Sequence, residues 1–208
     1  MAPAVFLFTT MDIAFRQLAF EQEHLLWIGQ LPAGLGLDPV PFEELWNLHP
    51  PQFPEIKMHG RCVRTPRWQQ SYGIDYAFAG RVSRALPVPS ILDPLLEWCR
   101  RTIDLRLNGL LVNWYDSALG HYIGAHRDSV TNRIAGSPIV MISFGQSRTF
   151  RLRPWRAVSR GRHLDIDATS MTVIVMPWQT NLACTHEIPP HRGESGRRIS
   201  VTLRCFDS

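Results

Sequence analysis

The stretch RRISVTLRCF (197–206), close to the end of the 208-residue chain, alternates between two kinds of side chain. Because successive side chains of a β-strand point to opposite faces of a sheet, this alternation predicts a strand. The apolar set is Ile199, Val201, Leu203 and Cys205, and the polar set is Arg198, Ser200, Thr202 and Arg204. The apolar face can enter a core. The polar face is either a basic, solvent-exposed edge or a surface that holds a ligand between two guanidinium groups.

Length and composition indicate a single folded domain, 1–208. The chain is 45% apolar and 10% aromatic, which is typical of a folded protein. It has no run of about 18 apolar residues and no basic residues in its apolar start, so we expect neither a membrane span nor a signal peptide. The four cysteines are scattered without a CxxC pair, which favours free thiols over a zinc site. We therefore expect a cytoplasmic protein, and nothing implies an obligate protein partner.

The basic residues are almost all arginine. The net charge is +4, the pI is near 9.2, and Lys57 is the only lysine among 22 basic residues. Guanidinium groups suit phosphates and carboxylates, so a polyanionic partner such as nucleic acid is one explanation. A nucleotide bias of the genome that replaces lysine by arginine explains the same composition.

The pattern changes near residue 108. In the N-terminal part (1–107), helices are predicted over 38–50 and over 90–105, the latter with Ser90 as a possible cap. From 108 to 208, short strand-like runs such as GLLVNWY and MTVIVM alternate with turn residues. Many short strands at this spacing indicate a sandwich or barrel. A mainly β jelly roll, supported by the 90–105 helix on one face, fits this pattern.

A candidate metal site lies within the strand-rich part. His126 and Asp128 are two residues apart, so on an extended segment their side chains point to the same side. His186 offers a third ligand. Two histidines and one carboxylate form the facial triad of non-haem Fe(II) oxygenases, which leaves coordination positions open. An isolated H-x-D pair is a weak signal, but the arginine strand that follows His186 strengthens it.

In combination, these motifs resemble the AlkB family of Fe(II)- and 2-oxoglutarate-dependent dioxygenases. The order N-x-Y, H-x-D, distal histidine and R-x5-R matches, and the resemblance covers roughly residues 54–206. The segments that carry it are NWYDSALGHYIGAHRDS (113–129), SPIVMISFGQSRTFRLR (137–153), THEIPP (185–190) and RISVTLR (198–204).

The resemblance implies a double-stranded β-helix core and oxidative dealkylation that consumes O2 and yields succinate, CO2 and formaldehyde. It assigns iron to His126, Asp128 and His186, and it assigns 2-oxoglutarate to Asn113, Tyr115, Arg198, Ser200 and Arg204. Arg198 is preferred for the distal carboxylate, although the sequence does not decide which arginine takes which end. Without the resemblance, Asn113 and Tyr115 would be interpreted as a cross-strand polar pair.

The segment TPRWQQSYGIDYAFAG (65–80) is similar to the family's substrate lid, which we expect over about 54–82. By this resemblance Tyr76 and Phe78 contact a flipped base of alkylated DNA or RNA. His59 would lie at the tip of a hairpin that approaches the strand. The nearby basic residues predicted to meet phosphates are Arg61, Arg64 and Arg67. Trp68 is interpreted equally well as a core residue.

One departure from the family concerns base recognition. Relatives that repair bases carry acidic residues after the H-x-D, whereas this chain has Ser129 and Val130, with Asp75 and Asn132 as the nearest substitutes. Three functions therefore compete: a nucleobase demethylase, a dioxygenase of the same family acting on a protein side chain or metabolite, and a binding module without turnover. The first predicts a basic groove and salt-sensitive nucleic-acid binding.

Overall fold

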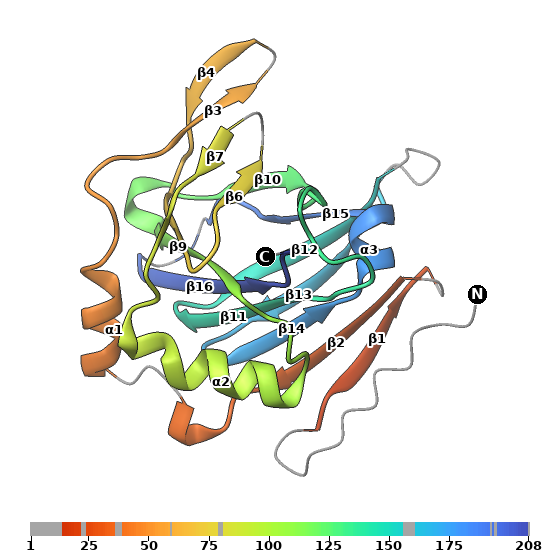
Figure 1. The fold of residues 1–208 in the computed structure, drawn as a ribbon. Coiled ribbons are helices and arrows are strands. Elements are labelled where there is room, and N and C mark those ends of the chain that lie inside the picture. The colour runs from red at the N-terminus through yellow and green to blue at the C-terminus, as the bar shows by residue number, and fades with distance from the viewer. Residues whose placement is uncertain are drawn as a thin grey trace.

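The fold was obtained as a computed structural model (Figure 1). The structure describes residues 14–21, 24–35, 39–58, 60–78, 81–155, 161–191, 193 and 195–207. All four cysteines are free thiols, as predicted. Within the described ranges, no helix is long and apolar enough to cross a membrane.

An eight-stranded sheet forms one layer of the molecule, in the order β1-β2-β14-β11-β16-β9-β5-β8. Neighbouring strands are antiparallel except for the short parallel pair β5 and β8. The strands are β1 (Arg16–Phe20), β2 (His24–Gln30), β14 (Thr172–Met176), β11 (Ile139–Gly145), β16 (Arg197–Arg204), β9 (Gly109–Asp116), β5 (Trp68–Tyr72) and β8 (Ala85–Leu86).

A four-stranded sheet faces the larger one, in the order β10-β15-β12-β13 (Figure 1). Its strands are β10 (Ile123–His126), β15 (Cys184–Ile188), β12 (Arg148–Pro154) and β13 (Leu164–Ala168). Apolar side chains from both sheets, including Met141 and Ile174 from one and Phe150 and Leu152 from the other, form a shared core. The predicted jelly-roll core is therefore confirmed.

The two helices predicted from sequence cover the outer face of the large sheet (Figure 1). The predicted helices are α1 (Pro39–Trp46) and the pair η2 (Ser90–Leu92) and α2 (Asp93–Thr102); η1 (Ala33–Leu35), η3 (Ser117–Leu119) and α3 (Trp178–Ala183) are short. Leu95, Trp98 and Cys99 of α2 are buried against the sheet, which confirms the supporting helix. Ser90 does not cap α2: the N-cap is Leu92, without a side-chain capping bond, because a 3-10 turn precedes the helix.

The strand with alternating apolar and polar residues near the end of the chain, β16, lies in the middle of the large sheet between β11 and β9. Its apolar residues Ile199, Val201 and Leu203 pack with α2 in the helix-side core. Arg198 and Arg204, on the opposite face, are only 2% and 3% exposed. The interpretation of this face as a solvent-exposed basic edge is therefore wrong, because the second sheet covers it.

The N-terminal part contributes more strand than its sequence indicates. β1 and β2 were not predicted, and they extend the large sheet beyond β14. Two hairpins project above the sheets: β3 (Glu55–Met58) with β4 (Arg61–Arg64), and β6 (Tyr76–Phe78) with β7 (Arg81–Ser83) (Figure 1). Between them β5 pairs with β9, so the middle of the expected lid is part of the large sheet. His59 lies outside the described residues.

Candidate metal centre and active-site pocket

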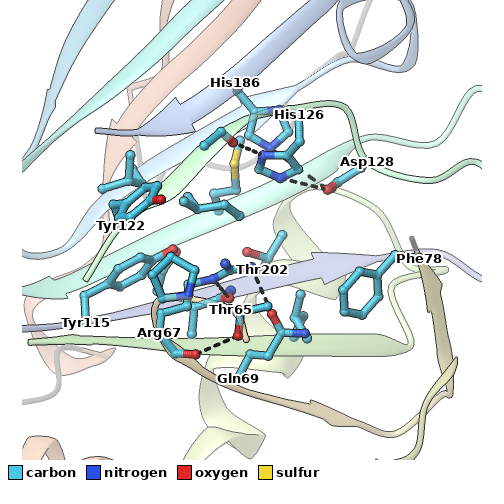
Figure 2. Close-up of a pocket in the computed structure, with 18 of the residues that line it drawn as sticks. Thr65, Arg67, Gln69, Phe78, Tyr115, Tyr122, His126, Asp128, His186 and Thr202 are labelled. Carbon is cyan, nitrogen blue, oxygen red and sulfur yellow. Dashed lines mark hydrogen bonds and ion pairs between the residues drawn. The ribbon is translucent and has the colours of Figure 1, made fainter. Parts of the chain in front are cut away.

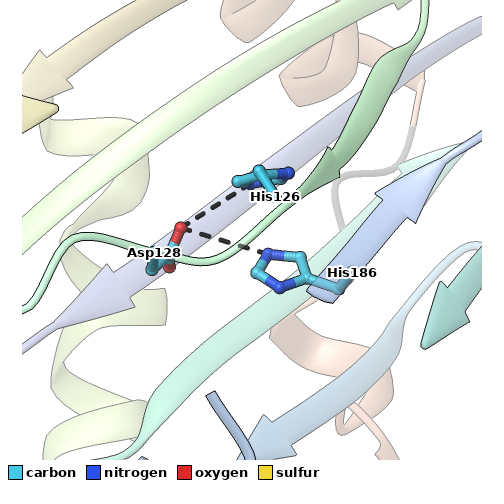
Figure 3. Close-up of side chains that lie close together, drawn as sticks. All are labelled: His126, Asp128 and His186. Atoms are coloured by element: carbon cyan, nitrogen blue, oxygen red, sulfur yellow. Dashed lines mark ion pairs between the residues drawn. The ribbon is translucent and has the colours of Figure 1, made fainter. Parts of the chain in front are cut away.

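Three candidate ligands predicted from sequence meet at one end of the small sheet (Figure 3). His126 ends β10 directly opposite His186 of β15, and Asp128 follows two residues later. Oδ1 of Asp128 lies 3.7 Å from Nε2 of His126 and 4.0 Å from Nε2 of His186. Ligand atoms that each lie ~2 Å from one ion are separated by up to about 4 Å, so this arrangement fits a single metal ion.

Hydrogen bonds orient two of the three ligands. Nδ1 of His126 lies 2.9 Å from the carbonyl oxygen of Gly124, and because a carbonyl only accepts, Nδ1 carries the proton. This tautomer leaves the Nε2 lone pair toward Asp128. Nε and Nη2 of Arg204 both donate to Oδ2 of Asp128, at 2.9 and 2.6 Å, which leaves Oδ1 to face the histidines.

The protonation states also suit a cation. Burial lowers the pKa of His186 to about 3, with a further contribution from His126, and burial lowers the pKa of His126 as well. Both imidazoles are therefore neutral near pH 7, as ligation requires. Burial by itself raises the pKa of Asp128, but the positive charge of Arg204 and its hydrogen bonds to the carboxylate outweigh burial and hold that pKa well below its usual range.

The triad opens into a cavity of about 420 Å³ between the two sheets (Figure 2). This volume is typical of small-molecule sites. Apolar walls come from Leu111, Met141, Phe150, Ile174 and Ile188. The polar residues of β16 and β9, Arg198, Ser200, Thr202, Arg204, Asn113 and Tyr115, all line the same cavity. The residues predicted from sequence to form one site are therefore brought together.

Arg198 is a buried cation with unused hydrogen-bonding capacity. Its Nη2 donates to Oγ of Ser143 at 2.8 Å, and its guanidinium lies 5.1 Å from the centre of the Tyr115 ring. Among the described residues, neither Nε nor Nη1 of Arg198 has a partner. Burial lowers the pKa of Arg198 to about 10, although it stays charged near pH 7. A buried charge with free donors is a binding site for an anion such as a carboxylate.

The sequence profile of the 2OG-Fe(II) oxygenase superfamily matches residues 39–204. The chain belongs to this superfamily. It is 30% identical over 163 residues to the DNA oxidative demethylase ALKBH2 of Bos taurus and 27% identical over 157 residues to that of Homo sapiens. Each match covers 72% of this chain. The chain spans only 56% of the length of the Bos taurus protein and 60% of the length of the Homo sapiens protein. These relatives confirm the resemblance to the AlkB family.

Among solved structures, that of OsALKBH1 shares the fold with a TM-score of 0.59 at 12% identity, over 92% of this chain and 100% of that one. The superfamily consists of oxygenases that use Fe(II) and 2-oxoglutarate, and His126, Asp128 and His186 supply the ligands that such an iron needs. Of the three functions that the sequence left open, the binding module without turnover is therefore the least favoured. The triad fits the iron of this AlkB-like dioxygenase, and the unpaired nitrogens of Arg198 fit a carboxylate of its cosubstrate.

Arg204 and Asn113, both predicted cosubstrate contacts of the dioxygenase, are bound to protein groups in the structure. Arg204 holds Asp128, as described above, so its observed role is to orient a metal ligand. Oδ1 of Asn113 accepts a bond of 2.8 Å from Nε of Arg67. Asn113 also lies opposite Ser200 in the sheet, as the cross-strand pairing requires. Contact of either residue with 2-oxoglutarate stays a prediction.

Arg67 was predicted to meet phosphates, and the structure corrects this. Its side chain is 7% exposed and lies inside the cavity, where Nη2 donates to Oε1 of Gln69 at 2.9 Å. A guanidinium held at this depth is out of reach of a phosphate backbone on the surface. Arg61 and Arg64 are exposed on β4, where contact with a nucleic-acid strand is open to them.

Tyr76 and Phe78, the predicted base contacts, both line the cavity. The guanidinium of Arg204 lies 4.5 Å from the centre of the Tyr76 ring, and Phe78 stacks on Tyr76 at 5.1 Å. Tyr76 is only 4% exposed. Because Tyr76 is enclosed, Phe78 is the more accessible of the two for a base.

Asn181 in α3 is a site residue that sequence reasoning missed. Its Oδ1 accepts from the backbone N–H of Asp128 at 3.0 Å, and its Nδ2 donates to the Asp128 carbonyl at 3.1 Å. These reciprocal bonds fix the segment that presents the carboxylate. Ser143 and Gln69 were missed as well. A polar residue inside an otherwise apolar stretch, as Ser143 is in IVMISFG, was the available signal.

Proposed function

We propose that the protein is an oxidative demethylase of N-methylated nucleobases in DNA, with His126, Asp128 and His186 as its iron ligands. The observation that carries the proposal is the similarity to relatives named DNA oxidative demethylase over 72% of the chain. The pocket beside the triad supports it, because it is lined by the aromatic residues Tyr76 and Phe78 of one hairpin and by the exposed Arg64 of another.

In the proposed reaction, the bound Fe(II) and 2-oxoglutarate supply the oxidation, and residues of the chain hold and orient these groups. With Fe(II) and 2-oxoglutarate bound, the site oxidises a C–H bond with O2, so that one oxygen atom enters succinate as CO2 leaves and the other enters the methyl group. The resulting N-hydroxymethyl group loses its hydroxyl proton as the C–N bond breaks, so formaldehyde leaves and the bonding electron pair stays on the base nitrogen. A cationic base thereby becomes neutral, whereas a neutral base takes up a proton at that nitrogen. Arg198 would hold the distal carboxylate of 2-oxoglutarate with Tyr115 and Ser143, and Arg204 keeps Asp128 ionised and aligned.

The chain's second task is to position the base and exclude water. A base turned out of the strand would enter between Phe78 and the triad, where an aromatic ring offers a stacking surface. Arg61 and Arg64 on β4 would attract the adjoining phosphates. This arrangement predicts binding to DNA that weakens as salt is raised.

The test is release of succinate and formaldehyde from oligonucleotides that carry single methylated bases. We expect both products in equal amounts with Fe(II), 2-oxoglutarate and ascorbate, and none with unmodified DNA beyond slow uncoupled succinate. His163→Ala is a matched control for substitution of a ligand histidine, because His163 lies on the surface beside Asp165. Succinate without formaldehyde from any methylated oligonucleotide refutes the proposal and directs the search to proteins or metabolites as substrates.

A further inference from the structure

The pocket is lined by an excess of positively charged side chains. Five arginines line it, and Asp128 is the only carboxylate among the described lining residues. Asp128 is already bound by Arg204 and faces the two histidines. The lining arginines are Arg64, Arg67, Arg127, Arg198 and Arg204. When the iron and the 2-oxoglutarate dianion are both bound, their charges cancel, so the substrate still meets a net positive surface.

Asp75 and Asn132, the nearest substitutes in the sequence for the missing acidic residues, do not line the pocket. Asp75 binds Arg84 at 2.6 Å and the backbone N–H of Ala85 at 2.8 Å, and it is not among the described lining residues. Asn132 likewise does not line the pocket. Val130 is 42% exposed and apolar. In the described part of the chain, the pocket therefore has no free acceptor carboxylate for a cationic base or an exocyclic amine.

Hydrogen-bond donors occupy this wall instead. Arg67 uses Nε for Asn113 and Nη2 for Gln69, which leaves Nη1 for a ligand. A guanidinium only donates, so the amide atom of Gln69 that faces Arg67 is oxygen and its other atom is the donor Nε2. Among the described residues, Nε2 has no partner, although Gln69 is 4% exposed and lines the pocket. Figure 2 shows both side chains on the other side of the cavity from His126 and Asp128.

We infer that the pocket selects neutral bases with a carbonyl group next to the methylated nitrogen, such as 3-methylthymine and 1-methylguanine, over the cationic 1-methyladenine and 3-methylcytosine. This inference rests on the proposed demethylase function. A carbonyl oxygen accepts from Arg67 and satisfies a buried donor, whereas a cationic base is repelled by the same guanidinium. 3-Methylthymine fits best, since carbonyl groups flank its methylated nitrogen on both sides.

The experiment compares four single-stranded oligonucleotides of one sequence, each with one of these four bases, under identical Fe(II) and 2-oxoglutarate. The expected kcat/KM for the carbonyl bases exceeds that for the cationic bases on the order of 10-fold, the effect of one nearby like charge. Equal or higher kcat/KM for 1-methyladenine and 3-methylcytosine overturns this inference but leaves the demethylase proposal standing. Turnover of none of the four, with uncoupled succinate only, removes both.

Arg67→Met tests whether this side chain sets the preference. We expect the ratio of kcat/KM for the carbonyl bases to kcat/KM for the cationic bases to fall in this variant. Losses of activity that are common to all substrates cancel in the ratio. Affinities of the same oligonucleotides, measured without O2 so that no turnover occurs, should move in the same direction. Arg151→Met is the control, because Arg151 pairs with Asp165 outside the pocket. A ratio that is unchanged in Arg67→Met overturns the inference.

Discussion

Replacing Arg198 with methionine is expected to stabilise the ligand-free protein and to abolish its response to 2-oxoglutarate. The two effects have opposite signs because the buried charge destabilises the fold when no anion is bound, whereas it contributes to the affinity for an anionic ligand. Methionine has a similar length and is flexible enough to fill the space of the arginine stem. The substitution therefore separates cosubstrate binding from folding.

The size of the expected stabilisation follows from the lowered pKa of Arg198. Burial lowers the pKa of Arg198 from 12.5 to about 10, a difference that corresponds to about 3 kcal/mol. Since the folded-state pKa of this base lies below its unfolded value, the cost is present at all pH values below about 10 and is relieved only as pH rises above that. Loss of the bond to Ser143 offsets about 1 kcal/mol. A net gain of about 2 kcal/mol corresponds to a rise in Tm of roughly 4–8 °C for a chain of this size.

The second effect is a loss of affinity. Hydrogen bonds to charged groups contribute about 1.5–3 kcal/mol each, so losing those from Nε and Nη1 would weaken 2-oxoglutarate binding about 100-fold or more. At a 2-oxoglutarate concentration of about 100 times the wild-type Kd, the wild type gains about 2.7 kcal/mol, whereas the variant gains less than about 0.5 kcal/mol.

Thermal unfolding with and without 2-oxoglutarate measures both effects, with Mn(II) in place of Fe(II) to prevent oxidation. Arg151→Met is the control, because the partly exposed pair of Arg151 and Asp165 contributes at most about 1 kcal/mol and lies away from the cavity. It should leave both the ligand-free Tm and the ligand-induced shift nearly unchanged. A lower ligand-free Tm in Arg198→Met, or a ligand-induced shift equal to the wild-type one, would refute the reasoning.

Three further predictions concern the triad. Asn181→Ala should weaken Mn(II) binding about 10–100-fold, because the backbone of Asp128 loses both of its hydrogen bonds to the Asn181 side chain. Calorimetric titration tests this, and unchanged affinity contradicts it. In the metal-free protein, stability should fall as pH drops below 6.5, because the unfolded state then binds a proton that His186, with its pKa of about 3, does not. At pH 5 the free energy of unfolding should have fallen by about 2 kcal/mol. His186→Leu should reduce this fall in a plot of unfolding free energy, measured with denaturant, against pH. A plot for the variant that runs parallel to that of the wild type would count against the prediction. His126→Ala should eliminate product formation while His163→Ala keeps it, and activity in the former would remove the metal assignment.

The elements with strong local patterns were predictable from sequence. β16 alternates cleanly, and α2 carries apolar residues at helical spacing, so each pattern needs only its own residues. The triad was predictable for a similar reason, since His126 and Asp128 lie two residues apart and only His186 had to be supplied by the fold. Periodicity does not show which strands pair with each other. The features that were not predicted depend on this pairing.

Arg67 illustrates this limit. In sequence it belongs to a run of basic residues on an expected lid, which favours an exposed phosphate contact. In the structure it precedes β5, whose pairing with β9 places it next to Asn113 in the cavity. The strands β1 and β2 escaped prediction for the same reason, because β2 pairs with β14, almost 150 residues away in the chain, and β1 joins the sheet only through β2. Ser90 failed as a cap because the 3-10 turn η2 moves the start of the helix to Asp93.

Arg198 and Arg204, the two arginines on the cavity face of β16, are equally buried, yet their environments differ. For Arg204, the Asp128 carboxylate outweighs burial and raises the pKa, so its charge is neutralised within the protein. For Arg198, burial prevails and the pKa falls, because the described residues offer it a hydroxyl and a tyrosine but no carboxylate. If Arg198 had a protein counter-ion, the fold would gain stability and the cavity would lose its anion site. The strand thus serves two purposes: one guanidinium completes the protein's own metal site, and the other is left uncompensated so that only a ligand can neutralise it.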